Sequence, residues 1–532
     1  MEPFVVSKAD LQLEPNSLAD QKRFGFRPRP DVRAWPLEFP IDWGANPFID
    51  NNWRLHLSAW RPLDAYLLEF FETRDPGVLL ECLPFMVDWH RYHFREGIAH
   101  KYSWYDMSTG QRAAKLAFFI EAAERAIVPF DDEAMQILRE LADAHIANLT
   151  VDANISRNNH GIFQVIGLKV LAKVVGAKAA EEFSVQMFRK LVMQQFTEEG
   201  VHAENSPDYH YFVQNTILRS RATHHFGDPF AGRGALVRAN NPWFVFPTGD
   251  VARVGDSYGK SDPPKEEPDN PITVNRRKYV VRDLTKSGYA IVRSLPSDPQ
   301  QSMLFVTGMA HTVAHKHADE LGFELFESGR FIFVDTGKYG YKSSPMRVYA
   351  LSAEAHNTIG LADKSVLPTD IEFSGSLLRP IAVSRRGFRI EGSLRRPGLF
   401  DQHRTIEYSP GKAMTVTDRV SSDHPREFVS SLHLAPNLLP FLRPDGFDVK
   451  VGRLQIRARV KGAARVETAR GQNDPPLGWH CTGYLQMTPT SVVRATSSLV
   501  RSATITWSIS FGGGFLDRLS QRLRSLVRIE YF

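Results

Sequence analysis

The first half of the chain carries apolar residues at helical spacing. Between residues 50 and 250, apolar positions recur three or four residues apart, most clearly over residues 116–126. This period places the apolar side chains on one face of a helix. Successive helices with short breaks between them predict antiparallel hairpins packed side by side. Further helices are predicted over residues 133–145, 161–175 and 177–196, with Asp131 and Asp132 as N-cap residues and Gly176 as a break.

The pattern changes after residue 270. Residues 255–271 are rich in proline, glycine and charge, which is typical of a linker. After them, short apolar runs separated by turn residues predict an antiparallel β-sandwich. The clearest strand-like runs are 289–293, 303–306, 323–326, 331–334, 413–417, 429–433 and 504–510. The predicted domains are an N-terminal extension (1–50), a helical domain (51–270), a β-sandwich domain (271–515) and a basic amphipathic tail (516–532).

The composition is that of a folded chain with more than one domain. Its 532 residues are 42% hydrophobic and 23% charged, which excludes a disordered or collagen-like protein. The formal net charge of +5 fits an anionic partner, an acidic polysaccharide, a nucleic acid or a membrane surface, and equally fits a generally basic proteome. A nucleic acid is not expected as a partner, because no basic helix or aromatic-basic pattern occurs. Cys82 and Cys481 lie far apart and predict no disulfide framework, so any metal would be held by histidine and carboxylate.

The two ends of the chain bear on localisation. The first ten residues lack an apolar core after a basic start, so no secretory signal is expected there. The chain as it stands is therefore expected to be cytoplasmic, or periplasmic or secreted if a signal lies outside this chain. In the tail, leucines share one helix face and arginines lie elsewhere, a pattern that fits contact with an anionic membrane surface. Packing of that face on its own domain is the commoner use of such a helix.

Two polar segments of the helical half offer candidate chemistry. Asn159 and His160 stand at a helix start, where side-chain donors and the helix dipole favour an anion, although a simple N-cap is the common alternative. In residues 198–211, Gly200 and Pro207 break the helix and Tyr209 follows. A tyrosine, with an ordinary pKa of about 10, can serve as general acid, or as base beside positive charge.

A third segment carries metal-ligand residue types. His315 and His317 are followed by Asp335 at the end of a strand-like run and by His356. Two or three imidazoles with a carboxylate are the ligands of a borderline metal such as zinc. Asp319 is a rival ligand, and spacing alone leaves a site without metal open.

Taken together, these segments resemble the heparinase II/III family of polysaccharide lyases, which includes related alginate lyases. The resemblance spans both halves of the chain. The matching pieces are Trp-Tyr-Asp (104–106) with Arg112, Asn-Asn-His (158–160), Glu-Asn-Ser-Pro-Asp-Tyr-His (204–210), His-Lys-His-Ala-Asp (315–319), Val-Asp-Thr-Gly (334–337), Tyr-Gly-Tyr (339–341), Ala-His-Asn-Thr (355–358), His-Arg (403–404) and Leu-His-Leu-Ala-Pro (432–436).

The resemblance implies an α+β fold of two domains, an incomplete (α/α) toroid followed by an antiparallel β-sandwich. It also implies β-elimination at a uronic acid within an anionic polysaccharide. The block at residues 41–54 resembles members associated with bacterial exopolysaccharides, so a bacterial polymer is as good a candidate as heparin.

The resemblance also implies roles for particular residues. Asn159 and His160 would hold the uronate carboxylate. Tyr209 would be the acid, in some members also the base, with Tyr211 as its fallback. His315 would be a second base or a carboxylate contact. Arg112 and Glu204 are expected to contact the substrate or to support the residues that do, and Tyr211 is a further expected substrate contact. His317, Asp335 and His356 are the expected ligands of a structural zinc or another divalent metal.

Two other functions stay open. A glycoside hydrolase on a similar helical toroid would need two carboxylates flanking the bond, and Glu198, Glu199, Glu204 and Asp208 are available. A non-catalytic glycan-binding or assembly protein would keep the fold and the metal. The joint presence of Asn159, His160, Tyr209 and His315 favours the lyase.

Overall fold

The computed structural model describes residues 4–219, 222–266, 269–452 and 454–512. Contacts divide the chain into two compact units, which are described separately. The first is Met1–Phe196 with Phe212–Gly234, and the second is Thr197–Tyr211 with Ala235–Phe532. The predicted amphipathic tail over residues 516–532 lies outside the described residues.

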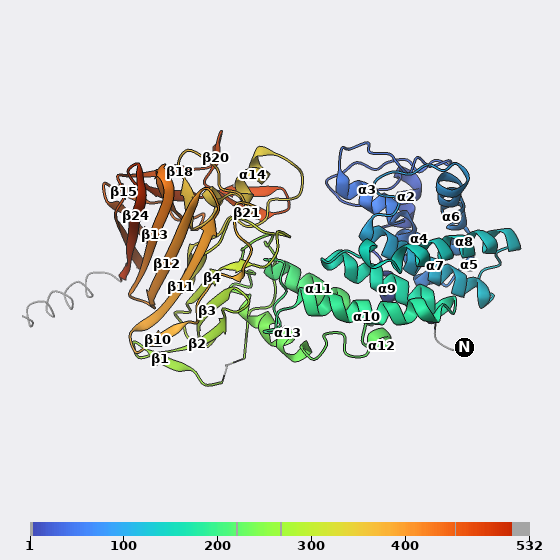
Figure 1. The fold of residues 1–532 in the computed structure, drawn as a ribbon, viewed down its shortest axis with the longest axis horizontal. Coiled ribbons are helices and arrows are strands. Elements are labelled where there is room, and N and C mark those ends of the chain that lie inside the picture. The colour runs from blue at the N-terminus through green and yellow to red at the C-terminus, as the bar shows by residue number, and fades with distance from the viewer. Residues whose placement is uncertain (1–3, 220–221, 267–268, 453, 513–532) are drawn as a thin grey trace, which may run out of the picture. The chain divides into compact units, whose positions relative to one another are not determined.

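The first unit is helical (Figure 1). Helices α7 and α9 pack backbone against backbone, because a Cβ on Gly167 would lie 2.0 Å from the carbonyl oxygen of Gly110. Asp131 caps α8 by accepting from the Ala134 N–H at 2.8 Å. The helices are α1 (Lys8–Leu11), α2 (Leu18–Phe24), α3 (Asn51–Ser58), α4 (Pro62–Thr73), α5 (Pro76–Leu80), α6 (Leu83–His90), α7 (Asp106–Glu124), α8 (Asp132–Leu149), α9 (Asn159–Val174), α10 (Lys178–Gln195) and α12 (Ala222–Phe226), with η1 (Arg91–Arg95) and η2 (Asp152–Asn154) between them. Helix α11 (Pro207–Arg219) runs from the second unit into the first.

The second unit is built on antiparallel sheets. One six-stranded sheet has the order β1 (Ile272–Val274), β2 (Arg277–Leu284), β3 (Tyr289–Ser294), β4 (Met303–Thr307), β6 (Phe323–Glu327), β7 (Arg330–Phe333). An eight-stranded sheet has the order β10 (Ala382–Ser384), β11 (Gly387–Arg396), β12 (Phe400–Ser409), β13 (Ala413–Arg426), β24 (Val500–Gly512), β17 (Leu454–Lys461), β16 (Gly446–Val451), β15 (Phe441–Arg443).

Smaller elements complete the second unit. A four-stranded sheet has the order β18 (Arg465–Arg470), β23 (Ser491–Thr496), β14 (Phe428–His433), β8 (Ile359–Leu361). The strand pairs are β5 (Met309–Ala310) with β9 (Gly375–Ser376), β19 (Gln472–Asn473) with β20 (Pro476–Leu477), and β21 (Trp479–Gly483) with β22 (Gln486–Pro489). The remaining helical elements are α13 (Gly234–Asn240), η3 (Asn241–Trp243), α14 (Pro345–Leu351) and η4 (Ala353–Ala355).

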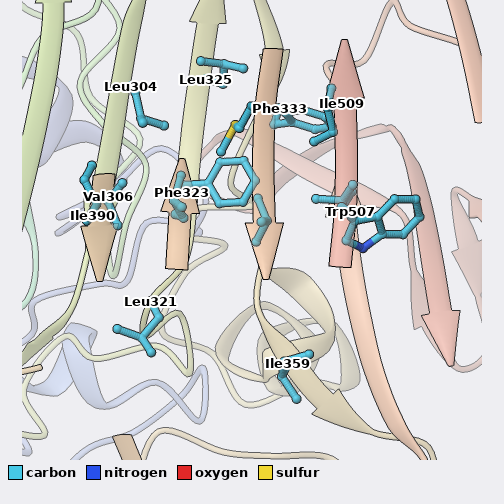
Figure 2. Close-up of a cluster of buried hydrophobic side chains, with 14 of the residues drawn as sticks. Leu304, Val306, Leu321, Phe323, Leu325, Phe333, Ile359, Ile390, Trp507 and Ile509 are labelled. Carbon is cyan, nitrogen blue, oxygen red and sulfur yellow. The ribbon is translucent and has the colours of Figure 1, made fainter. Parts of the chain in front are cut away.

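The core of the second unit lies between its two large sheets. Figure 2 shows Leu304, Phe323 and Leu325 of the six-stranded sheet in one cluster with Trp507 and Ile509 of the eight-stranded sheet. Strands β11 and β13 of the eight-stranded sheet alternate buried residues with more exposed ones along most of their length, whereas β3, β4 and β6 of the six-stranded sheet are buried throughout. Burial of apolar surface on facing sheets is the main stabilising contribution in such a sandwich.

The predicted fold class is confirmed. Every helix and strand-like run named from the sequence within the described residues overlaps an element of its predicted type and extends at most two residues beyond it. No helix in the described part of the chain is both long and apolar enough to cross a membrane.

Candidate active site

The candidate site in the second unit is built around Tyr209 and His315. Their rings stack, with centroids 3.4 Å apart and planes 17° from parallel. Pro207 begins α11, so Tyr209 lies in its first turn, where its N–H donates to Ser206 Oγ at 3.3 Å. The Tyr209 hydroxyl is hydrogen-bonded to the hydroxyl of Tyr341. Burial raises the pKa of Tyr209 above its ordinary value, so the phenol keeps its proton at neutral pH.

Close backbone contacts fix the loop that carries His315. His315 has a φ of 54°, a left-handed conformation that a non-glycine residue adopts at a cost. The side-chain amide of Asn205 donates to the carbonyls of Thr312 and Ala314 at 2.8 and 2.9 Å. A Cβ on Gly255 would lie 2.2 Å from the backbone carbonyl oxygen of Asn205 and 2.8 Å from that of His315. Only glycine allows these three segments to approach so closely.

The carboxylate of Asp256 fixes the His315 ring through its Nδ1 atom. This carboxylate accepts from His315 Nδ1 at 3.0 Å, from His317 Nε2 at 3.1 Å and from Arg347 Nη1 at 2.7 Å. Burial alone would raise the pKa of Asp256, but these partners hold it well below its ordinary value. In a neutral imidazole whose Nδ1–H donates to Asp256, the lone pair is on Nε2. Glu204 Oε2 lies 3.5 Å from this Nε2.

Sequence reasoning missed Asp256 and gave Tyr341 no role. Asp256 lies in the proline-rich, charged segment that predicted a linker, and nothing there distinguishes it from Asp262 or Asp269. Its side chain is nevertheless 0% exposed. Tyr341 belongs to a quoted motif, but the sequence offered no sign that its hydroxyl meets Tyr209.

The predicted metal ligands lie together without converging on one point. His356 Nδ1 lies 2.9 Å from both oxygens of Asp335, and the rings of His317 and His356 are 5.3 Å apart. Two buried nitrogens, His317 Nδ1 and His356 Nε2, have no hydrogen-bond partner among the described residues. The donor types suit zinc, but no group of three or more His, Cys, Asp or Glu in the described chain is arranged to hold an ion. The rival Asp319 accepts from Lys316 Nζ and from the Gly255 N–H.

Asn159 and His160 lie at the start of α9 in the helical unit. Asn158 caps the helix by accepting from the His160 N–H at 3.0 Å. His160 Nδ1 lies 3.0 Å from Asp106 Oδ2, which also accepts from Ser156 Oγ at 2.8 Å. Burial alone would raise the pKa of Asp106, but the hydrogen bond and charge of His160 lower it below its ordinary value. Asn159 is buried beside this pair.

The other predicted contacts behave differently from one another. Arg112 is 0% exposed and donates to the Ser58 and Ser103 carbonyls and to His145 Nε2. This burial leaves Arg112 no surface for direct contact with a substrate, so of its two expected roles only support of other residues fits, and its bonds join separate helical segments. The Tyr211 hydroxyl donates to the Asn241 carbonyl, so it is not part of the phenol pair. Glu204 stays beside His315.

A family model and several solved structures are similar to this chain. Residues 276–508 match the family model described as heparinase II/III-like, C-terminal. No curated protein sequence matches the chain. Heparan sulfate lyase HepC from Pedobacter heparinus has a similar structure, with a TM-score of 0.64 at 15% identity over 96% of this chain and 86% of that one.

Two further solved structures are similar. Heparinase III gives a TM-score of 0.69 at 12% identity, over 91% of this chain and 82% of that one. Chondroitin AC lyase from Streptomyces coelicolor A3, in complex with chondroitin sulphate, gives 0.53 at 8% identity, over 88% and 75%. Identities this low establish the fold alone, a helical toroid followed by an antiparallel β-sandwich.

Proposed function

Because residues 276–508 form a heparinase II/III-like C-terminal domain, we propose that the chain is a polysaccharide lyase. Its substrate would be an anionic polysaccharide that contains uronic acid, including bacterial exopolysaccharides. The observation that carries the proposal is the stack of Tyr209 on His315, which brings a protonated phenol against an imidazole held through Nδ1.

The reaction is a β-elimination. A base removes the proton on C5 of the uronate, and the C–H electron pair becomes the C4=C5 double bond. The C4–O4 bond breaks, and an acid gives a proton to O4. Negative charge builds on the uronate carboxylate as C5 loses its proton, so donors aimed at that carboxylate lower the barrier.

Tyr209 and His315 fit the two proton transfers. The raised pKa of Tyr209 makes it the acid, because it holds a proton to give to O4. The Nε2 lone pair of His315 makes this ring the base for C5. C5 and O4 are two bonds apart, so acid and base must lie close together, and the rings of Tyr209 and His315 are stacked with their centroids 3.4 Å apart. Asp256 is the positioning residue that keeps the proton on Nδ1.

Asn159 and His160 are assigned to the substrate carboxylate. An amide N–H and an imidazole N–H are donors suited to a carboxylate. In an imidazolium both ring nitrogens are donors, so His160 can donate through Nδ1 to Asp106 and through Nε2 to the substrate carboxylate.

A structural zinc held by His317, Asp335 and His356 is part of the proposal. Two buried imidazole nitrogens without a partner, next to a carboxylate, support it. A bound zinc would link three segments of the second unit: the one that carries His317, the one with Asp335 just after β7, and the one with His356. No proton-transfer step involves it.

A substrate panel tests the function. The protein is incubated with sulfated and unsulfated uronate polymers, and ultraviolet absorbance reports the C4=C5 product. We expect product from at least one polymer, and a loss on the order of a thousandfold in Tyr209→Phe, which cannot protonate O4. Tyr66→Phe, which removes a phenol hydroxyl from α4, is the matched control and should keep its rate.

Three outcomes would count against the lyase. Release of reducing ends without absorbance would indicate a hydrolase. Binding without any cleavage would indicate a glycan-binding protein. An active Tyr209→Phe would remove Tyr209 from the acid role.

A further inference from the structure

Lys338 places a cation against the phenol pair. Its ammonium lies 4.3 Å from the ring centroid of Tyr341, 5.5 Å from that of Tyr258 and 5.6 Å from that of Tyr209. The backbone N–H of Lys338 donates to the carbonyl of Ser257, the residue after Asp256. The cation therefore lies against the rings of the proposed acid and of its hydroxyl partner.

This ammonium lacks a counter-ion within the part of the chain that the structure describes. No carboxylate oxygen there comes within 4.0 Å of Lys338 Nζ, and no protein oxygen accepts a hydrogen bond from it. Buried lysines elsewhere are paired: Lys316 with Asp319 at 2.9 Å, and Lys115 with Asp64 at 3.0 Å. Three aromatic faces attract the charge but leave its three N–H groups without acceptors.

An unpaired, half-buried ammonium is costly, and an arriving anion would remove that cost. Burial lowers the pKa of Lys338 below its ordinary value, as expected for a cation without an adjacent counter-ion. The two carboxylates whose charges act on Lys338 from further away are engaged elsewhere: Asp256 by His315, His317 and Arg347, and Asp208 by the backbone N–H groups of Tyr258 and Gly259. The protein thus offers a donor site that a ligand oxyanion would complete.

We infer that Lys338 binds an oxyanion, a sulfate or a carboxylate, on the sugar that leaves with O4. This rests on the proposed function, because Tyr209 as the acid for O4 defines which sugar lies beside Lys338. The carboxylate of the uronate itself is assigned to Asn159 and His160. The preferred substrate is then a polymer with negative charge on both sugars around the broken bond.

Matched substrates separate the two sources of the oxyanion. Heparan sulfate and chondroitin sulphate are compared with their desulfated, N-acetylated forms, in which the leaving sugar is neutral. Alginate supplies a carboxylate on the leaving sugar without any sulfate. kcat and KM are measured for wild type, Lys338→Gln, Lys338→Arg and Lys342→Gln, the last removing an exposed charge nearby as the control.

The expected result is a change in KM that depends on the substrate. Lys338→Gln should raise KM about tenfold on polymers charged on both sugars, the size of one charge-assisted hydrogen bond, and much less on the neutral-leaving-sugar forms. kcat should change less than KM, and Lys338→Arg should recover most of the loss. A rise on sulfated polymers alone identifies sulfate, and a rise on alginate alone identifies carboxylate. Equal loss on every polymer, or none on any, would overturn the inference.

Failure of the lyase proposal can be told apart from failure of this inference. If wild type forms no unsaturated product, calorimetric binding of the same oligosaccharides still compares wild type with Lys338→Gln. Weaker binding confined to the charged-leaving-sugar ligands would support the oxyanion site on its own. Identical affinities in the two proteins would reject the site whether or not any polymer is cleaved.

Discussion

Two aspartates hold the two candidate histidines, one in each unit, and they do so differently. Asp106 binds His160 Nδ1 at 3.0 Å with only Ser156 as a second side-chain partner, and its side chain is 16% exposed. Asp256 binds His315 Nδ1 at the same 3.0 Å, but its side chain is 0% exposed and is shared with His317 and Arg347. The same contact is thus a partly solvated pair in one unit and a buried junction of three segments in the other.

This difference predicts unequal consequences when each contact is lost. Water can replace part of what Asp106 does, because the pair reaches solvent. Nothing replaces Asp256, since its oxygens are closed off from solvent and three cationic or imidazole groups depend on them. Asp256 should therefore matter more to the rate, although only Asp106 belongs to a motif visible in the sequence.

Asp256→Asn should cause the largest effect. We expect kcat to fall on the order of a thousandfold, because an amide no longer enforces the Nδ1–H tautomer that leaves the Nε2 lone pair for C5. KM should change little, since a side chain with no exposed surface cannot touch the polysaccharide. Steady-state kinetics on the substrate identified by the panel measures both.

Asp418→Asn provides the control for a purely structural loss. Asp418 is also a fully buried carboxylate in the second unit, where it accepts from Arg404 Nε at 2.7 Å. Its loss should lower the melting temperature while the folded fraction keeps its kcat. If Asp256→Asn behaves in the same way, Asp256 is a structural residue and not a positioning one.

Asp106→Asn should have an intermediate effect. Loss of one hydrogen bond to a charged partner costs about 1.5–3 kcal/mol, or roughly ten- to a hundredfold in kcat/KM. The Asn158 cap still fixes the backbone of His160, which limits the damage. Kinetics of Asp106→Asn and Asp256→Asn side by side measures the contrast, and equal losses in the two variants would refute it.

The fold was predictable from the sequence where apolar period decided the structure. Helices α7 and α9 and strands β3 and β4 are continuous apolar or amphipathic runs, so local pattern and tertiary burial agree. Strands β11 and β12 were not named, because they carry Arg389, Arg395 and other charged residues on their exposed face. Apolar and polar residues do alternate along these strands, but a search for continuous apolar runs misses them because every second position is polar or charged.

The site was predictable only as far as motifs reach. Tyr209, His315 and His160 lie in short motifs of recognisable residue types. Asp256 bonds to residues 59, 61 and 91 positions away, and no local pattern marks such a partner. Arg112 shows the converse, because a motif does not tell a residue that contacts substrate from one that supports it, and Arg112 is buried among carbonyls.

Metal removal probes how far the Asp256 junction extends, because Asp256 also holds His317. We expect about one zinc per chain by elemental analysis, and a melting temperature lower by several degrees after chelation. kcat should fall less than tenfold, because the metal supports a segment and does not act on the sugar. His356→Ala should lose the metal, while His424→Ala, an exposed histidine, should keep it. Protein without zinc would reject the ligand set and leave the lyase assignment untouched.

Arg112→Lys should have the smallest effect on the rate, although Arg112 lies on α7 with Asp106. A lysine cannot reach the Ser58 carbonyl, the Ser103 carbonyl and His145 Nε2 together, and each buried acceptor left unmatched costs about 1–3 kcal/mol. Thermal unfolding should register that loss as a lower melting temperature. kcat/KM of the folded protein should change less than about twofold, since no atom of Arg112 is exposed to a substrate. A tenfold loss of kcat/KM at an unchanged melting temperature would show that Arg112 acts on the site after all, and that α7 contributes more to it than the Asp106–His160 pair.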